Sequence, residues 1–365
     1  MKSAVPSLPA LRTKRMIALA SDPEKSAKAV ALRYVSISEP GIRRVKKGKG
    51  FAYFLDGKKL SDKESLERIR ILRVPPAWRE VWICREANGH IQATGLDAKG
   101  RKQYRYHASW NQLRNLTKFS RMRTFGEKLP LLRIQLEKDI SRKELDEHKV
   151  LATVISLMER TYIRIGNSGY EKANGSYGIT TLKDKHVRIS GSDLEFSFKG
   201  KSGVKQKISV HHRRLARIVK QCRDIPGNEL FQYYDKEGNA HSIDSGRVNA
   251  YIKAATGEDF TAKDFRTWAG TLNALQAFVS LGEAATATER KQKIVAVVDQ
   301  VSARLGNTRA VCRKYYIHPK LIELYEQEKL KDYLQELDQI EADDNLTGWT
   351  KEELLLLKIF REEMK

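Results

Sequence analysis

The spacing of apolar residues divides the chain into two regions. Up to residue 107, short apolar stretches alternate with glycine-containing turns, which is typical of β-strands. The predicted strands are 29–35, 51–55, 81–84, 90–94 and 104–107. One helix is expected among them, because Ser61 and Glu64 have the capping-box spacing and apolar residues follow at helical intervals as far as Leu72.

From residue 108 the pattern becomes that of long amphipathic helices, beginning with Leu113, Phe119 and Phe125. Between residues 177 and 210 it changes to strict alternation of apolar and polar positions. This predicts an antiparallel sheet of three or four strands inserted among the helices. The predicted fold class is therefore α+β: a small strand-rich N-terminal domain, then a mainly helical domain with an inserted antiparallel β-sheet.

We expect four segments. Residues 1–28 show no sustained period and predict a mobile basic tail. Residues 29–107 form the strand-rich domain, 108–330 the helical domain and 331–365 an acidic helical extension. From Leu321 onward there are 13 acidic and 6 basic residues, and we expect two helices there, separated near 345–349.

The charge points to a polyanionic partner. Lys and Arg total 68 against 45 Asp and Glu, a net charge of +23, and the excess is spread over many segments. A protein that neutralises phosphates releases their counterions, so this surface favours nucleic acid binding. Charge alone leaves open a basic surface that serves solubility, or association with the ribosome.

Other classes are disfavoured. The longest stretch without a charged side chain, 268–282, is shorter than the roughly 20 apolar residues of a membrane-spanning helix. Cys84, Cys222 and Cys312 form no C-x-x-C pair and have no histidine at ligand spacing. We therefore expect a cytoplasmic protein near the nucleoid, with no disulfide, metal or cofactor. An organelle presequence stays open, because the first acidic residue is Asp22.

A few basic residues and a tyrosine, spread along the chain, are candidate catalytic residues. Arg164, Lys201 and Arg266, each taken alone, are typical of surface ion pairs. Tyr316 lies nine residues after Asn307 and follows two basic residues. A phenol with a pKa near 10 is a poor nucleophile unless guanidinium groups stabilise the phenolate and the charge of a pentavalent phosphorane.

The order Arg, hairpin Lys, Lys-x-x-Arg, and Asn nine residues before Tyr resembles the type IB DNA topoisomerases, in particular their small poxvirus-like and bacterial branch. The segments 74–78 (Val-Pro-Pro-Ala-Trp) and 95–106 are similar to N-terminal segments of that branch. The resemblance covers roughly residues 29–330. It implies the helical catalytic fold that topoisomerases share with tyrosine recombinases.

The resemblance also implies roles for individual residues. Tyr316 is similar to the nucleophile, Arg164 and Arg266 to the arginines that hold the scissile phosphate, Lys201 to the general acid and Lys263 to a further basic residue of the site. Asn307 stands where most of the family has histidine; an amide still donates a hydrogen bond to a phosphoryl oxygen. Tyr315 is the competing nucleophile, and the nine-residue spacing favours Tyr316.

The implied reaction is relaxation of positive and negative supercoils in duplex DNA. One strand is nicked through a 3′-phosphotyrosyl link, the duplex rotates, and the strand is religated without ATP or metal. We expect a monomer that closes on DNA as a clamp. Expected DNA contacts in the N-terminal domain are Arg101, Lys102, Tyr104, Arg105 and Tyr106. For the two tyrosines, packing within the sheet is an equally open interpretation.

Two alternative functions share part of this pattern. A tyrosine recombinase would share the catalytic set, but recombinases favour histidine three residues before the second arginine, where this chain has Lys263. The strand-rich N-terminal segment also differs from the helical domain expected of an integrase. A non-catalytic DNA-binding protein would bind in a salt-sensitive way and form no covalent adduct.

Overall fold

The computed structural model describes residues 19, 22–48, 50–98, 100–342 and 347–364. The chain divides into two compact units, Met1–Arg121 and Met122–Lys365, which are treated separately below. In the described residues, no helix is long and apolar enough to cross a membrane.

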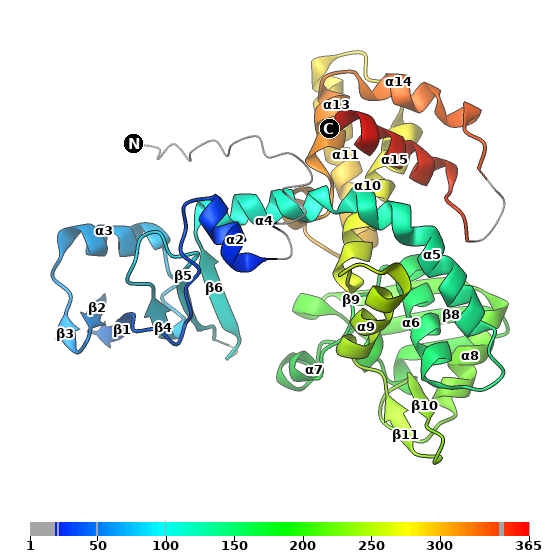
Figure 1. Ribbon diagram of the computed structural model, residues 1–365, viewed down its shortest axis with the longest axis horizontal. Helices are drawn as coiled ribbons and strands as arrows, with labels where there is room; N and C mark the ends of the chain where they lie inside the picture. Colours follow the sequence, from blue (N-terminus) through cyan, green and yellow to red (C-terminus); the bar gives the residue numbers. More distant parts are fainter. Residues whose placement is uncertain (1–18, 20–21, 49, 99, 343–346, 365) are drawn as a thin grey trace. The chain divides into compact units, whose positions relative to one another are not determined.

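The first unit is built on a six-stranded antiparallel sheet with the order β3-β2-β1-β4-β5-β6 (Figure 1). The strands are β1 (Ile42–Lys47), β2 (Gly50–Leu55), β3 (Lys58–Lys59), β4 (Arg79–Ile83), β5 (Ile91–Leu96) and β6 (Lys102–Tyr106). Helix α3 (Lys63–Leu72) joins the sheet core through Ile69, which is buried with Ile42 and Ile83. Four predicted strands thus fall on β2, β4, β5 and β6, whereas β1 lies in a basic segment for which no strand was predicted.

Helix α3 begins one residue later than the capping box indicates. Its N-cap is Asp62, whose carboxylate accepts a hydrogen bond from the backbone N–H of Ser65 at 2.8 Å. An aspartate one residue before the first turn competes directly with a serine for this role.

The strand predicted at 29–35 is wrong. Helix α2 (Pro23–Ala29) occupies the start of this segment, with Asp22 as its N-cap and proline in its first turn, and Arg33 makes only an isolated bridge to Gly89. The predicted tail is also wrong for 23–28, because Ala27 packs in a buried cluster with Trp110. The rest of the predicted tail, apart from residues 19 and 22, lies outside the described residues.

The same cluster explains why the first unit ends at Arg121 and not near residue 107. Trp110 belongs to α4 (Ala108–Ser120), the first of the predicted long helices. Its contact with Ala27 of α2 places α4 in the first unit.

The second unit is mainly helical (Figure 1). Its helices are α5 (Met122–Ile140), α6 (Glu147–Thr161), α7 (Ser168–Asn174), α8 (Arg213–Arg223), α9 (Ser245–Thr256), α10 (Ala262–Leu281), α11 (Ala287–Leu305), α12 (Arg309–Tyr315), α13 (Pro319–Glu326), α14 (Leu330–Gln335) and α15 (Lys351–Glu363). Between α7 and α8 lies the antiparallel sheet β7 (Val187–Ser190), β8 (Asp193–Lys199) and β9 (Lys205–His211), in that order. This confirms the predicted inserted sheet with three strands.

A second hairpin escaped prediction. Strands β10 (Gln232–Tyr234) and β11 (Ala240–Ser242) pair antiparallel between α8 and α9, where helix was expected. Each strand has only three residues, too few for an alternating pattern to stand out.

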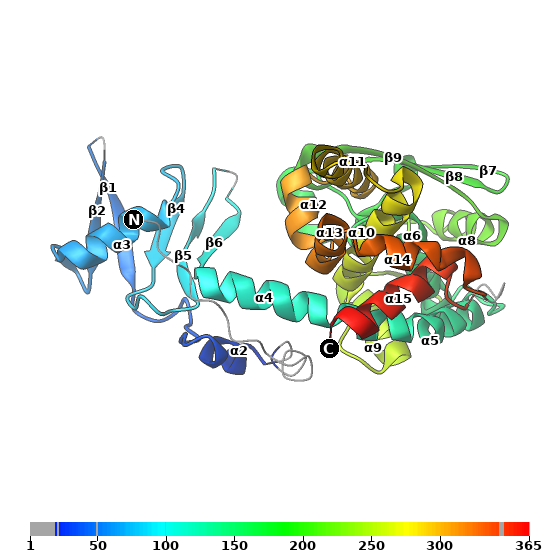
Figure 2. The same cartoon turned by 90° about the horizontal axis from the view of Figure 1, so that it is seen from above.

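The acidic C-terminal segment is not a separate extension. Helix α15 lies against α5 and α10 (Figures 1 and 2), and its buried side chains are Glu353, Leu355, Leu356, Leu357, Ile359 and Phe360. Its leucines complete the core of the second unit. From Leu321 onward the described residues hold α-helical turns of α13, α14 and α15, where two helices were expected. The predicted break at 345–349 falls partly outside the described residues.

Candidate active site

Tyr316 is held by its backbone against helix α10. It caps α12, with its N–H donating to the carbonyl of Cys312 at 2.9 Å. Its own carbonyl accepts a hydrogen bond from Thr271 Oγ1 at 3.1 Å. A Cβ atom on Gly270 would lie 2.5 Å from that carbonyl oxygen. Glycine at 270 therefore allows this approach, which fixes the position of Tyr316.

Arg266 lies one turn before Gly270 and on the same face of α10. Its guanidinium carbon is 5.2 Å from the centre of the Tyr316 ring. The side chain is 6% exposed and donates to the carbonyls of Tyr162 and, at 2.7 Å, Leu305. Burial lowers the pKa of Arg266, and a hydrogen bond with Tyr316 and its charge oppose this shift.

Arg164 follows the left-handed residue Tyr162 that ends α6. It donates to the carbonyl of Gly306 at 3.1 Å and to Oδ1 of Asn307. Burial, together with the positive charge of Arg266, lowers its pKa to about 10. Each positive guanidinium group disfavours the charge of the other, so an anion bound between them would stabilise both.

Asn307 follows α11, which ends at Gly306 with a left-handed φ of 56°. Its N–H donates to the carbonyl of Ser302 at 3.0 Å. Because Arg164 occupies Oδ1, the amide nitrogen Nδ2 is free to donate. Within the part of the chain that the structure describes, both this nitrogen and Nε of Arg266 are buried without a hydrogen-bond partner. Leaving two buried donors unpaired is costly unless a ligand accepts from them.

Lys201 comes from the inserted sheet. It begins the short 3₁₀ turn Lys201–Gly203 between β8 and β9, and its side chain is exposed. It lines one small cavity together with Arg164 and Arg266. The other residues around this cavity are Thr161, Tyr162, Ile163, Tyr177, Phe198, Gly200, Gln206, Arg304 and Leu305.

The structure thus brings together the five predicted catalytic residues. Arg164, Lys201 and Arg266 share a cavity, Asn307 is bound to Arg164, and Tyr316 lies beside Arg266. The first and last of these residues are far apart in sequence.

Two predicted site residues lie less centrally. Lys263, one turn before Arg266 on α10, is exposed and does not line the cavity formed by the described residues. The competing nucleophile Tyr315 is 38% exposed, with the Lys314 ammonium 5.3 Å from its ring centre.

The predicted DNA contacts of the first unit lie on and beside β6. Tyr104 and Tyr106 stack with ring centres 5.8 Å apart and remain 42% and 39% exposed. Arg101 is paired with Asp97 at 2.7 Å, Arg105 donates to the Arg73 carbonyl at 3.3 Å, and Lys102 is exposed. The two rings therefore form a partly exposed aromatic surface, and each ring also carries a hydroxyl group. This surface lies on β6, an edge strand of the sheet.

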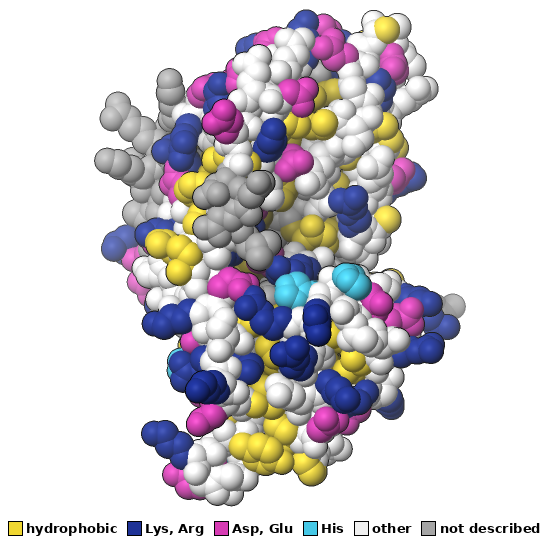
Figure 3. Space-filling view, turned by 90° about the vertical axis from the view of Figure 1, so that its right-hand side faces the viewer, with side chains coloured by type: hydrophobic (Ala, Val, Ile, Leu, Met, Phe, Trp, Pro, Cys, Tyr) yellow, Lys and Arg dark blue, Asp and Glu magenta, His cyan; other side chains and the backbone are white. Residues whose placement is uncertain are grey.

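Basic side chains also gather elsewhere on the second unit. Figure 3 shows one face on which lysines and arginines predominate in the lower half. Helix α8 contributes Arg213, Arg217, Lys220 and Arg223, which line an open groove beside the β7–β8 turn. This distribution agrees with the polyanionic partner expected from the net charge.

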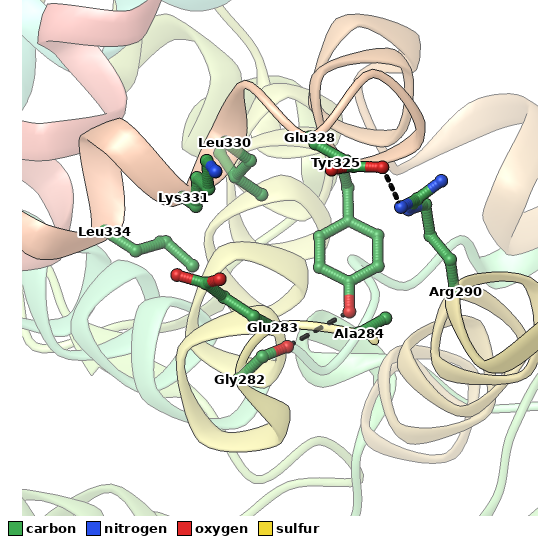
Figure 4. A pocket seen from close by; sticks show the side chains of 9 residues that line it. All are labelled: Gly282, Glu283, Ala284, Arg290, Tyr325, Glu328, Leu330, Lys331 and Leu334. Atoms are coloured by element: carbon green, nitrogen blue, oxygen red, sulfur yellow. Dashed lines mark hydrogen bonds and ion pairs between the residues drawn. The ribbon is translucent and has the colours of Figure 1, made fainter. Parts of the chain in front are cut away.

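A further cavity lies between the end of α10 and helices α11, α13 and α14 (Figure 4). In it the Tyr325 hydroxyl donates to the Gly282 carbonyl at 3.0 Å, and Arg290 is paired with Glu328. These polar groups satisfy one another, so we assign this cavity a structural role.

Sequence reasoning missed the residues that support the site. Gly270 and Thr271 hold the backbone of Tyr316, and Gln206 and Arg304 line the cavity. A glycine in the interior of a helix was the available signal for Gly270, because it is costly there without a packing reason.

Comparison with known proteins agrees with this arrangement. Residues 107–343 match the family model for the eukaryotic DNA topoisomerase I catalytic core, and residues 50–97 match that for the bacterial DNA topoisomerase IB N-terminal domain. The chain is 35% identical over 294 residues to DNA topoisomerase 1B of Acanthamoeba polyphaga mimivirus, an alignment that covers 78% of this chain and 88% of the relative. It is 23% identical over 296 residues to DNA topoisomerase I of Monkeypox virus and to DNA topoisomerase 1B of Vaccinia virus (strain Copenhagen), covering 77% of this chain and 91% of each relative.

The fold and the matches define an isomerase that acts on DNA. The chain belongs to the type IB DNA topoisomerase family. The resemblance, fold class and activity predicted from the sequence are confirmed, and the recombinase alternative is not favoured.

Proposed function

We propose that Tyr316 is the nucleophile of this topoisomerase and that Arg164, Arg266 and Asn307 hold the scissile phosphate. The observation that carries this proposal is the pair of buried, unpartnered donors among the described residues, Nε of Arg266 and Nδ2 of Asn307. A phosphodiester beside Tyr316 would supply the acceptors that both donors lack. Tyr316 itself lies beside Arg266, with the guanidinium carbon 5.2 Å from the centre of its ring.

The first step is an in-line transesterification. Tyr316 Oη forms a bond to phosphorus as its proton leaves to solvent, and the bond from phosphorus to the 5′-oxygen breaks. The two guanidinium groups and the Asn307 amide stabilise the charge of the phosphorane, where electrostatic preorganisation contributes most. The products are a 3′-phosphotyrosyl link and a 5′-oxygen that needs a proton.

Lys201 is proposed to supply that proton as the general acid. Its place in the hairpin turn, lining the cavity with both arginines, supports this role. Religation reverses the step: the 5′-hydroxyl attacks phosphorus, its proton returns to the Lys201 amine, and Tyr316 leaves. The phosphodiester energy is kept in the covalent link, so no ATP is consumed, and cationic side chains do the electrostatic work that a metal would do in other enzymes.

We further propose that the protein acts as a monomer, with the first unit as the other half of a clamp on duplex DNA. The exposed stacked pair Tyr104–Tyr106 supports a DNA-facing role for β6, with Arg101, Lys102 and Arg105 near phosphates. Lys263 is proposed to contact DNA beside the site. Association with the nucleoid follows from these contacts as part of the same proposal.

A relaxation assay tests the reaction. Supercoiled plasmid in EDTA without ATP should be relaxed, and denaturant added during the reaction should trap a nicked strand linked to the protein at Tyr316. Relaxation with no trapped adduct at Tyr316, as located by peptide mapping, would contradict the assignment.

A further inference from the structure

Gln206 of β9 bridges two parts of the site that are far apart in sequence. A Cβ atom on Gly200 would lie 3.1 Å from Gln206 Cγ, and one on Gly306 would lie 2.7 Å from its Nε2 and 3.0 Å from its Oε1. The side chain therefore crosses Gly200, next to the hairpin turn, and ends on Gly306. Both positions have room for it because both are glycine.

Gly306 connects helix α11 to the residues of the site. It ends α11 in the left-handed conformation, which suits glycine. Its carbonyl accepts the hydrogen bond of Arg164, and Asn307 is the next residue. Gln206 thus packs on the segment that holds the proposed phosphate-binding groups.

The hairpin turn gives Lys201 little support of its own. Among the described residues, no hydrogen bond or ion pair restrains its side chain. The turn contains Ser202 and Gly203 with φ of 63° and 82° and closes with a bond from Gly200 N–H to the Val204 carbonyl at 2.8 Å. The position of the Lys201 ammonium therefore depends on how the hairpin is docked.

The two strands of the hairpin are docked at different points. On β8, the Lys199 carbonyl accepts a hydrogen bond from the backbone N–H of Tyr177 at 2.8 Å. On β9, Gln206 packs across Gly200 onto Gly306. The second contact is made to Gly306, whose carbonyl binds Arg164 and whose next residue is Asn307.

We propose that Gln206 is a positioning residue for proton transfer. By docking β9 on Gly306, it sets the distance between the Lys201 ammonium and the 5′-oxygen of a phosphate held by Arg164 and Asn307. In this role it acts through the hairpin and not on the reacting atoms. The inference rests on the proposed role of Lys201 as the general acid, because a shift of the hairpin matters most for a group that must reach its target.

Gln206→Ala should expose this role in single-turnover cleavage at saturating DNA. A misplacement of about 1 Å can cost on the order of 10²-fold in rate, so we expect cleavage of an ordinary strand to slow about 10- to 100-fold. On a strand with a 5′-bridging sulfur the leaving thiolate needs no proton, and the variant should cleave at close to the parent rate. Gln206→Met, which keeps the bulk over both glycines, should restore most of the rate on the ordinary strand.

Lys207→Ala is the matched control. Lys207 is on the same strand, with an exposed side chain paired with Glu195 at 3.3 Å, and its variant should match the parent on both substrates. Melting temperature and DNA affinity are measured for every variant. In Gln206→Ala, neither the melting temperature nor the DNA affinity should change enough to explain the slower cleavage of the ordinary strand. This result separates a positioning role from a loss of folding or of DNA binding.

Lys201→Ala separates the two proposals. Suppose that the cleavage rate of Lys201→Ala recovers on the sulfur strand, as expected of a general acid. If Gln206→Ala is then equally slow on both strands, or cleaves both at the parent rate, Gln206 does not position the acid. If Lys201→Ala itself fails to recover, Lys201 is not the general acid and the inference about Gln206 falls with it.

Discussion

Arg164 donates a hydrogen bond to Oδ1 of Asn307, and this contact decides which end of the amide faces the site. With the oxygen occupied, only Nδ2 can bind a phosphoryl oxygen, and this nitrogen is buried without a partner among the described residues. The arginine thus orients the amide as well as supplying charge.

Asn307→Ala should slow cleavage by about 10²- to 10³-fold, the usual cost of one lost transition-state donor. Asn307→Asp should be slower still, although it can accept from Arg164, because it replaces the donor with a negative charge facing the phosphate. Single-turnover cleavage rates at saturating DNA measure both effects. If the alanine variant were as fast as the parent, Asn307 would have a structural role only.

Tyr316→Phe should abolish covalent adduct formation and leave DNA affinity nearly unchanged, because it removes one hydroxyl and no charge. Tyr315→Phe should retain relaxation, since that ring is exposed and lies beside Lys314 rather than Arg266. Plasmid relaxation and filter binding provide the comparison. The opposite result, activity in the first variant and none in the second, would assign the nucleophile to Tyr315.

The sequence could predict residues that the structure brings together, but not the contacts that hold them in place. Strict alternation predicted β7, β8 and β9, because one face of each strand is buried. Likewise, the nine-residue spacing singled out Asn307 and Tyr316, which the structure places on either side of α12. The contact between Arg164 and Asn307 joins residues on either side of the inserted sheet, and no local pattern encodes it.

Errors in the fold arose where packing outweighed local signals. Residues 29–35 were expected to form a strand, but helix α2, whose Ala27 is buried with Trp110, ends at the first of them. The residues after it form a turn and the isolated bridge of Arg33. The acidic segment 331–365 was expected to be a helical extension. Apart from the buried Glu353, its charged residues lie on the outer side of helices whose apolar side is buried, which net charge cannot reveal.

The pKa of Arg164, lowered to about 10 by burial and by Arg266, predicts a pH limit. The active form is the protonated guanidinium, so cleavage at subsaturating DNA should fall as pH rises through about 10. Arg164→Lys should move this fall to lower pH, because lysine has an ordinary pKa about two units below that of arginine. Rates measured across the alkaline range test this, and a fall at the same pH in both proteins would assign it to another group.

Glu353 predicts that α15 is required for the stability of the second unit. Its carboxylate is 2% exposed and accepts from Arg133 at 2.8 Å and from Trp268 Nε1 at 3.2 Å. Arg133 is shared with Glu159 at 2.7 Å. Burial disfavours its charge, but the two carboxylates outweigh burial and raise its pKa.

Glu353→Ala should lower the free energy of unfolding by about 3–5 kcal/mol, the usual cost of breaking a buried ion pair by removing one partner. Glu353→Gln should cost less, because its amide oxygen can still accept from Trp268. Lys358 lies on α15, as Glu353 does, and forms a solvent-accessible ion pair with Glu336. Lys358→Ala should therefore cost at most about 1 kcal/mol. Urea denaturation of the three variants compares them. Helix α15 lies beyond the residues that match the catalytic-core family model, so equal stability of Glu353→Ala and the parent would mean that the core closes without it.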